Sequence, residues 1–293
     1  MVTEQDVRLR VAAMVFGLKQ RDGPQTIALP EGHCAFCHDE SACSDVAQAD
    51  SDSLCLEVLS APILAPDSGW RAICRTPIWE LWQDGAGRDV YTAPRQAPPR
   101  QALLAPDYAA GEVRCPANGQ QGLYPLQGLD NLILSNWLAR RGDVILHAAG
   151  VALGGKGYLF VGPAGAGKST LAAHLQAAHG ATVLGEDQIA MRYLDGRFWV
   201  FGTPWHLNAG MCSPAGAPLE RLYCLDRTAP QGVAPLSPGQ ALARLLQAAF
   251  VPYYRPEAVE AILERLSALV ERMPIASLSY RLGTDALPYV SAI

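Results

Sequence analysis

The chain has 293 residues, of which 49% are hydrophobic and 17% charged, so it can bury a substantial core and is not a wholly disordered chain. Its formal net charge of −5 and the lack of a basic stretch argue against nucleic acid as a partner. No segment reaches the roughly 18 apolar residues that cross a bilayer, and the N-terminus carries acids and arginines, unlike a secretory signal. We therefore expect a cytoplasmic protein with no membrane partner.

The first 53 residues are expected to form an N-terminal appendage. Its opening, "MVTEQDVRLRVAAMVFGLKQ", has apolar residues at Val7, Val11, Met14, Val15 and Leu18. This spacing predicts a short amphipathic helix. A polar, acidic tract ends the appendage.

Four of the eight cysteines lie in "HCAFCHDESACSDVAQADSDSLC", three in this appendage and the fourth, Cys55, just after it. A Cys-x₂-Cys pair commonly holds a tetrahedral metal, and thiolates suit Zn²⁺ or an iron–sulfur cluster. The motif C-x-x-C-H also matches a haem attachment site, which we set aside because haem attachment normally requires export. The loose spacing leaves a second interpretation open, a solvated loop with free thiols. The candidate metal ligands are Cys34, Cys37, Cys43 and Cys55, with His33 and His38 nearby.

Residues 54–120 are expected to form a β-rich region. Short apolar runs such as "LCLEVLS" and "WRAICR", bounded by Gly, Pro and Asp, predict strands and hairpins. The stretch "TAPRQAPPRQALLAP" is predicted to be a connector, or an edge segment that cannot join a central sheet.

Residues 121–293 are expected to form a separate C-terminal domain. A helix is predicted around Leu129–Trp137 and ends before Gly142. The runs "VILHAAGVAL" and "YLFVGP" flank "GGKG", which predicts a hairpin. If its turn spans 154–157, Leu153 faces Tyr158, and His147 lies opposite Ala164.

The second strand of this hairpin leads into "GPAGAGKST", which fits G-x-x-x-x-G-K-[ST]. Glycines let backbone N–H groups turn toward a phosphate, and the following helix adds its positive end. Lys168 is expected to reach the β- and γ-phosphates of ATP, and the hydroxyl of Ser169 to ligate Mg²⁺. The alternative is a glycine-rich turn without a ligand. The expected nucleotide-binding residues are Gly162, Ala164, Gly165, Ala166, Gly167, Lys168, Ser169 and Thr170.

A helix, "STLAAHLQAAHG", follows the loop, and then a short buried strand, "TVL", ends at Glu186 and Asp187. Two acids at the end of a strand beside a phosphate loop can hold Mg²⁺ or accept a proton from a hydroxyl. A solvated turn is the alternative. Further on, a hairpin is predicted to turn at Asp195–Gly196, and a long amphipathic helix begins at Pro256.

The order of these motifs resembles the catalytic domain of HPr kinase/phosphorylase, and more closely the HPr-kinase-like proteins encoded with peptide-modification genes. The resemblance rests on "LHAAGVALGGKGYLFVGPAGAGKSTLAAHL", "VLGEDQIAM" and "FGTPW". It implies an α/β phosphoenolpyruvate-carboxykinase-like P-loop fold with a mixed sheet, beside the β-rich N-terminal region. It also implies Asp187 as the catalytic base, Glu186 as a magnesium-associated acid and His147 at the phosphate site. The enzymes it resembles assemble, so a homo-oligomer is a possible state.

Two departures from that family affect the expected activity. Glu186 stands where the family often has aspartate, and the glycine- and arginine-rich stretch linked to phosphorolysis is missing. A kinase is therefore expected rather than a phosphorylase, transferring the γ-phosphoryl group of ATP to a hydroxyl, usually serine. The acceptor would be a peptide, a protein or a small molecule. The alternative is an ATP-binding regulatory module without phosphotransfer, and no guanine-recognition motif supports a GTPase.

Overall fold

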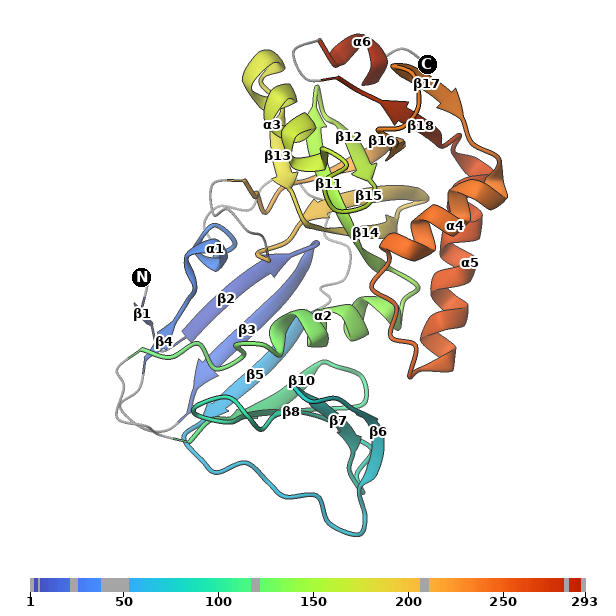
Figure 1. Cartoon of the computed structure of the whole chain (residues 1–293). Helices are drawn as coiled ribbons and strands as arrows, with labels where there is room; N and C mark the ends of the chain where they lie inside the picture. Colours follow the sequence, from blue (N-terminus) through green and yellow to red (C-terminus); the bar gives the residue numbers. More distant parts are fainter. Residues whose placement is uncertain are drawn as a thin grey trace. The chain divides into compact units, whose positions relative to one another are not determined.

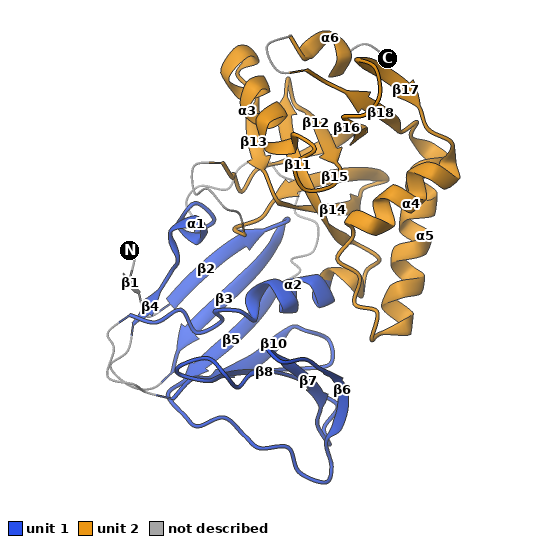
Figure 2. Cartoon of the chain, viewed as in Figure 1, with its two compact units in different colours: residues 1–137 blue, residues 138–293 orange. Residues whose placement is uncertain are grey.

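A computed structural model of the chain describes residues 3–4, 6–21, 26–37, 53–116, 122–205, 211–281 and 285–290. The chain divides into two compact units, Met1–Trp137 and Leu138–Ile293, each with its own mixed β-sheet (Figure 2). The fold is therefore mixed α/β with few helices, in agreement with the expected class at that level (Figure 1). None of the described helices is long and apolar enough to span a bilayer.

The first unit is built on an eight-stranded sheet in the order β2-β3-β5-β10-β9-β8-β7-β6. The pairs β3–β5 and β5–β10 are parallel and the other pairs are antiparallel. The strands of the sheet are β2 (Asp6–Val11), β3 (Met14–Gln20), β5 (Ser53–Leu59), β6 (Arg71–Arg75), β7 (Glu80–Gln83), β8 (Asp89–Ala93), β9 (Arg100–Leu104) and β10 (Ala110–Arg114). The unit also contains β1 (Thr3–Glu4), β4 (Ile27–Ala28) and α1 (Glu31–Cys34), and α2 (Asp130–Ala139) crosses its C-terminal boundary.

The helix predicted near the N-terminus is wrong, because the segment forms the β2–β3 hairpin. Val7, Leu9 and Val11 alternate with more exposed residues and are at most 3% exposed, which is the period of a strand. The turn is Ala12–Ala13, and both residues have positive φ, 54° and 60°. Without an Asn-Gly or Gly-Gly pair, the sequence offers no usual hairpin signal at this point.

Two boundaries in the first unit also differ from expectation. β3 pairs with β5, so strands from the first 53 residues belong to the same sheet as residues 54–120. The compact unit extends to Trp137, beyond the boundary expected at residue 120. The proline-rich segment does join the interior of the sheet, because β9 begins directly after Pro99 and pairs on both sides, with β8 and β10.

In the second unit the strand pairs β12–β11, β11–β14, β14–β15, β15–β16 and β16–β12 close a ring. β13 pairs with β11 outside this ring, while β18 pairs with β16 and β17 with β18. The strands are β11 (Val144–Leu153), β12 (Lys156–Val161), β13 (Thr182–Gly185), β14 (Gln188–Leu194), β15 (Arg197–Gly202), β16 (Gly216–Leu225), β17 (Gly232–Pro235) and β18 (Ala276–Ser279). The helices are α3 (Lys168–His179), α4 (Pro238–Ala248), α5 (Pro256–Arg272) and α6 (Leu287–Val290).

Alternate residues of the central strands enter two separate cores. On β11, Leu146 and Ala148 belong to the core that includes residues of α4 and α5. Ala149 and Val151 belong to the core that includes Leu171 and other residues of α3. The strands therefore lie between α3 on one face and the α4–α5 pair on the other, which leaves the N-terminus of α3 at the end of β12 (Figure 1).

Several local predictions are confirmed in this unit. α3 ends at Gly180, which has a left-handed conformation with φ 67°, as a glycine C-cap requires. The β14–β15 hairpin turns at Asp195–Gly196, and α5 begins at Pro256.

Candidate active site

The phosphate-loop motif links β12 to α3, as expected. Gly165 and Gly167 have positive φ of 76° and 97°, and a Cβ at either residue would meet no atom within 4 Å. The need for glycine there is therefore conformational. Gly162 is limited by space instead, since its Cβ would lie 3.1 Å from Cβ of Ala166 and 3.4 Å from that of Leu225.

Lys168 is the first residue of α3 and is only 6% exposed. Its Nζ atom donates to the carbonyl oxygen of Gly162 at 2.8 Å and lies 3.1 Å from Nε2 of His147. Burial lowers the pKa of Lys168, and the negative charge of Asp187 partly offsets that effect. The ammonium group is thus held at the start of the loop.

His147 lies beside the phosphate loop, but the hairpin register differs from the predicted one. The turn is the two-residue pair Gly154–Gly155, so Leu153 pairs with Lys156 and not with Tyr158. A shift of two residues keeps the same side chains on each face of a strand. His147 therefore lies beside the loop as predicted, although it is not the residue opposite Ala164.

Glu186 and Asp187 form the link between β13 and β14, two strands that both pair with β11. Gln188, the next residue, pairs with His147, and the carbonyl oxygen of Asp187 accepts a hydrogen bond from the backbone N–H of Ala148. The Asp187 side chain lies with Oδ1 2.9 Å from Nδ1 of His147. Glu186 is buried, at 6% exposed, whereas the Asp187 side chain is 28% exposed.

Lys168, His147 and Asp187 thus form one chain of polar contacts. The Lys168 ammonium donates to Nε2 of His147, and Nδ1 of the same ring lies beside the Asp187 carboxylate. The imidazole therefore connects the cation of the loop to the carboxylate.

Two adjoining hollows, of about 630 and 820 Å³, open around these three side chains. His147 lines both, and so do residues 164–166 of the loop. Ser169, Thr170, Glu186 and Asp187 line the larger hollow. The structure therefore brings the predicted nucleotide-binding residues together with both acids.

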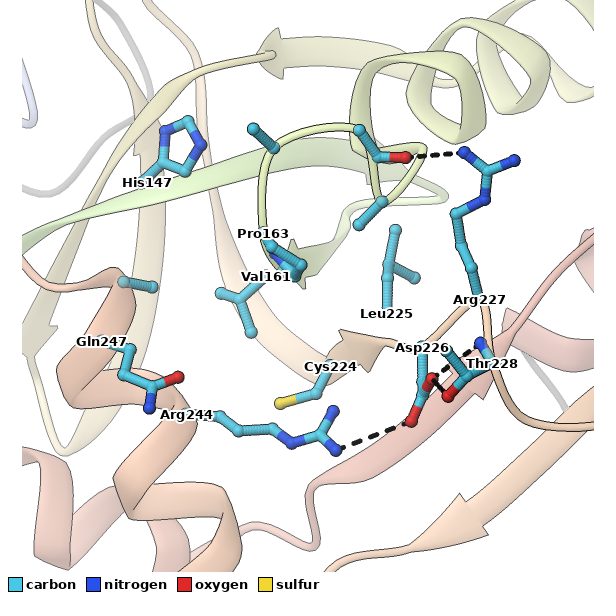
Figure 3. Close-up of a pocket in the computed structure, with 15 residues that line it drawn as sticks. His147, Val161, Pro163, Cys224, Leu225, Asp226, Arg227, Thr228, Arg244 and Gln247 are labelled. Atoms are coloured by element: carbon cyan, nitrogen blue, oxygen red, sulfur yellow. Dashed lines mark hydrogen bonds and ion pairs between the residues drawn. The ribbon is translucent and has the colours of Figure 1, made fainter.

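The smaller hollow also contains charged residues that the sequence analysis missed (Figure 3). Arg244, on α4, lies with Nη2 3.7 Å from Oδ2 of Asp226. Burial raises the pKa of the nearby Cys224 thiol to about 11, so it stays protonated at neutral pH. The capping-box pattern Ser237–Gln240 marks the start of α4 and could have revealed the helix, but not its orientation.

Of the two arginines in and just after the second half of β16, Arg221 and Arg227, only Arg227 lies at the site. Arg227 lines both hollows and donates from Nη1 to the carbonyl oxygen of Gly165 at 2.8 Å (Figure 3). Arg221 lines neither hollow and lies in β16 opposite Tyr158.

The described part of the "FGTPWHL" segment does not line the two hollows. Thr203 is fully buried, and its hydroxyl donates to the carbonyl oxygen of Gln188 at 2.9 Å, which is a structural role. Neither Thr203 nor Trp205 lines the two hollows. His206 lies outside the described residues.

The expected cysteine metal site is not formed by the described cysteines. Cys37 forms an isolated backbone β-bridge with Leu9 of β2, whereas Cys55 lies in β5. β3 lies between those two strands. His33 contacts the carboxylate of Asp130 at 2.9 Å instead of approaching the cysteines. Cys43 and His38 lie outside the described part of the chain. Closeness in the sequence did not predict closeness in space for Cys37 and Cys55, because β3 lies between β5 and the strand that Cys37 contacts.

The donor set around the larger hollow fits magnesium. The hydroxyl of Ser169 and the carboxylates of Glu186 and Asp187 line the same hollow, and Mg²⁺ prefers oxygen ligands and keeps several waters. Lys168 and Arg227 add positive charge to the same hollow.

No protein-family model and no curated protein sequence matches the chain. Among solved structures, the HPr(Ser) kinase/phosphatase from Coxiella burnetii is similar, with 13% identity and a TM-score of 0.26. The match covers 48% of this chain and 82% of that chain. At these values the similarity does not assign a role to any residue.

Proposed function

We propose that the second unit is an ATP-dependent phosphotransferase that moves the γ-phosphoryl group to a hydroxyl, most simply a serine hydroxyl. The observation that carries the proposal is the chain of polar contacts from Lys168 through His147 to Asp187. It connects the phosphate-loop cation to a partly exposed carboxylate across a hollow that the loop also lines.

Each group has a defined part in this reaction. Backbone N–H groups of the loop and the N-terminus of α3 bind the phosphates, and Lys168 neutralises the β- and γ-phosphate oxygens. Ser169 and Glu186 would hold Mg²⁺, which supplies charge neutralisation at the phosphates when it is bound. Asp187 accepts the proton of the acceptor hydroxyl while the hydroxyl oxygen forms a bond to the γ-phosphorus. ADP leaves with the electrons of the broken P–O bond.

His147 would position the base rather than act as one. Its ring contacts Asp187 through Nδ1 and Lys168 through Nε2, so it holds both groups in place. Arg227 would stabilise charge on the transferring group, since its guanidinium lies at the loop carbonyl of Gly165.

The test is transfer of label from γ-labelled ATP and Mg²⁺ into a lysate of the source cells. We expect label in one peptide, protein or metabolite, with the stability to acid and lability to base of a serine phosphoester. Asp187→Asn should bind ATP but transfer about 10²–10⁴-fold more slowly, as removal of a general base predicts. Asp195→Asn makes the same change at an exposed turn and should be fully active.

Two outcomes would contradict this proposal. ATP binding without any labelled product would favour a nucleotide-binding regulatory module whose partner senses the bound state. An acid-labile product would mean transfer to a histidine or a carboxylate and not to a hydroxyl.

A further inference from the structure

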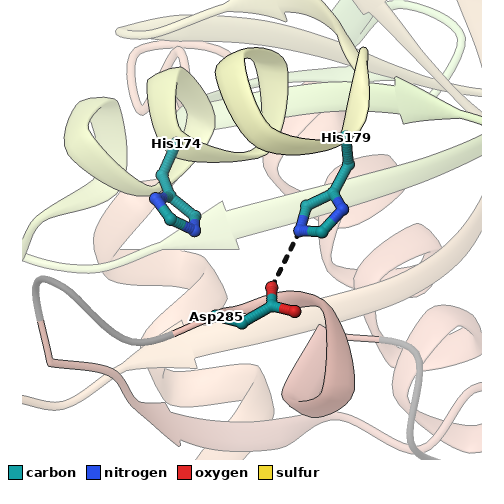
Figure 4. A group of neighbouring side chains, drawn as sticks. All are labelled: His174, His179 and Asp285. Carbon is teal, nitrogen blue, oxygen red and sulfur yellow. Dashed lines mark hydrogen bonds and ion pairs between the residues drawn. The ribbon is translucent and has the colours of Figure 1, made fainter.

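A second cluster of ionisable side chains lies at the far end of α3, away from the phosphate loop. His174 and His179 come from the second half of this helix, and Asp285 precedes α6 (Figure 4). Each residue offers one donor atom, and these atoms all lie within 4.8 Å of one another. Among the described residues this is the group of histidine, cysteine and acidic side chains with the spacing of metal ligands.

His174 provides an independent sign of a missing partner. Its Nε2 atom is buried and, within the described residues, has no hydrogen-bond partner. Leaving a buried polar nitrogen unsatisfied is unfavourable, so such atoms are usually paired with protein, water or an ion. The ring lies between two aromatic neighbours, His179 at 6.3 Å and Tyr280 at 5.8 Å between centroids.

The charge around the cluster favours a cation. Asp285 contributes a carboxylate, whose Oδ1 accepts a hydrogen bond from the backbone N–H of Leu287 at 3.0 Å. His179 lies in the last turn of α3, where the helix dipole presents partial negative charge. Oδ1 of Asp285 already lies 2.8 Å from Nε2 of His179, so one ion could contact both.

We propose that His174, His179 and Asp285 bind a divalent transition-metal ion, zinc first, with a fourth position open to solvent. Two neutral imidazoles and one carboxylate are a common zinc donor set. Ligands about 2.0–2.2 Å from a tetrahedral metal lie roughly 3.4 Å from one another, so the donors need only small side-chain movements. The ion would replace the direct His179–Asp285 contact and satisfy Nε2 of His174.

The bound ion would tie the C-terminal segment to the phosphate-loop helix. α6 is already anchored, because the hydroxyl of Tyr223 donates to the carbonyl oxygen of Val290 at 2.9 Å. A metal at Asp285 would take the place of the direct His179–Asp285 contact and hold the segment to both histidines of the helix whose N-terminal end carries Lys168. This proposal does not depend on phosphotransfer.

The experiment is a Co²⁺ titration of the full chain, purified without a histidine tag and stripped of metal. We expect one equivalent to bind with visible ligand-field bands and without a thiolate-to-cobalt charge-transfer band, which separates this site from the cysteines. Zn²⁺ should displace the cobalt and raise the thermal unfolding midpoint.

Asp285→Asn and His179→Gln should each weaken Co²⁺ binding by more than the ~10-fold that loss of an outer-shell partner typically causes. Gln176→Ala, at an exposed position on the same helix, and Asp195→Asn should bind like the unchanged chain. Binding of equal strength in the Asp285→Asn and unchanged chains, a spectrum dominated by thiolate bands, or no bound cobalt would each overturn the proposal.

Discussion

Nδ1 of His147 lies 2.9 Å from Oδ1 of Asp187, and one strand positions both residues. β11 carries His147 and pairs with β13 and β14, whose two-residue link contains Asp187. The carboxylate is therefore fixed by strand pairing on either side of it and not by a long loop. Such placement suits a group that must meet a reacting atom in a defined geometry.

The contact between these residues predicts a graded effect of substitution at His147. His147→Ala removes the donor that orients Asp187, and we expect kcat to fall by roughly 10²-fold, the lower end for general-base catalysis. His147→Asn keeps an N–H near the position of Nδ1 and should recover part of that loss. Steady-state kinetics with saturating ATP measures both variants, and equal kcat values for Ala and Asn would contradict a positioning role.

Lys168 should contribute to nucleotide affinity more than any other lysine. Lys168→Met removes a charged donor to phosphate, and hydrogen bonds to charged groups are worth about 1.5–3 kcal/mol, so ATP should bind about 10- to 150-fold more weakly. Lys156→Met is the matched control, because this lysine is exposed in the β11–β12 hairpin and pairs with Glu220. Calorimetric titration with ATP measures both, and similar losses in the two variants would contradict the assignment.

The lowered pKa of Lys168 predicts proton uptake on binding. Burial makes the free site lose its proton at a lower pH than an ordinary lysine, whereas bound phosphates favour the charged form and raise the pKa. Between the pKa of Lys168 in the free protein and its higher pKa in the complex, the complex holds more protons than the free protein. The affinity for ATP should therefore fall as the pH rises through the pKa of the free protein. Calorimetry in buffers of different ionisation enthalpy measures the uptake, and Lys168→Arg should abolish it. Uptake that persists in this variant would assign the proton to another group.

The sequence predicted most local structure of the second unit because its signals are local. The glycine C-cap at Gly180 and the turn at Asp195–Gly196 are determined by neighbouring residues, and both are confirmed. The Ala12–Ala13 turn was missed because alanine rarely adopts positive φ. The interior position of β9 was missed because the prolines lie before the strand and leave its own N–H groups free to pair.

The candidate site was predictable for those residues that lie on or next to consecutive elements of the chain. His147 lies on β11, the loop follows β12, and Asp187 follows β13. Their order along the chain therefore indicates that they lie close together. Arg244 reaches the site from α4 through the packing of that helix, which no spacing rule encodes. His174 and Asp285 meet for the same reason, across more than a hundred residues of sequence.

Gly167 should resist substitution because of its backbone conformation. At φ 97° a Cβ is strained, so Gly167→Ala should lower the free energy of unfolding by about 1–2 kcal/mol or force the loop to rearrange. Either result should weaken ATP binding, because the loop N–H groups would point elsewhere. Gly239→Ala, in the first turn of α4, meets no atom within 4 Å and has no positive φ, so it should be neutral or slightly stabilising. Urea unfolding with ATP titration compares them, and equal behaviour of the two variants would contradict the argument.

A buried ion pair at the start of β11 should be important for stability. Nε of Arg192 lies 2.9 Å from Oδ2 of Asp143, with side chains 5% and 3% exposed, and the other carboxylate oxygen accepts the backbone N–H of Tyr193. Arg192→Met leaves the carboxylate buried without its cation, so we expect a loss of about 3–5 kcal/mol at neutral pH.

The loss should depend on pH in a defined direction. Burial already raises the pKa of Asp143, and Arg192 opposes that rise, so the variant should have a still higher pKa in the folded state. A carboxyl group whose folded pKa exceeds its unfolded value favours folding when protonated, and that contribution disappears as pH rises through the folded pKa. The deficit of Arg192→Met should therefore shrink in mildly acidic solution. Arg197→Met, exposed at the turn of the same hairpin, should change stability by less than about 0.5 kcal/mol at either pH. Urea unfolding at the two pH values measures both variants, and a deficit that stays constant or grows in acid would show that Asp143 remains charged without its partner.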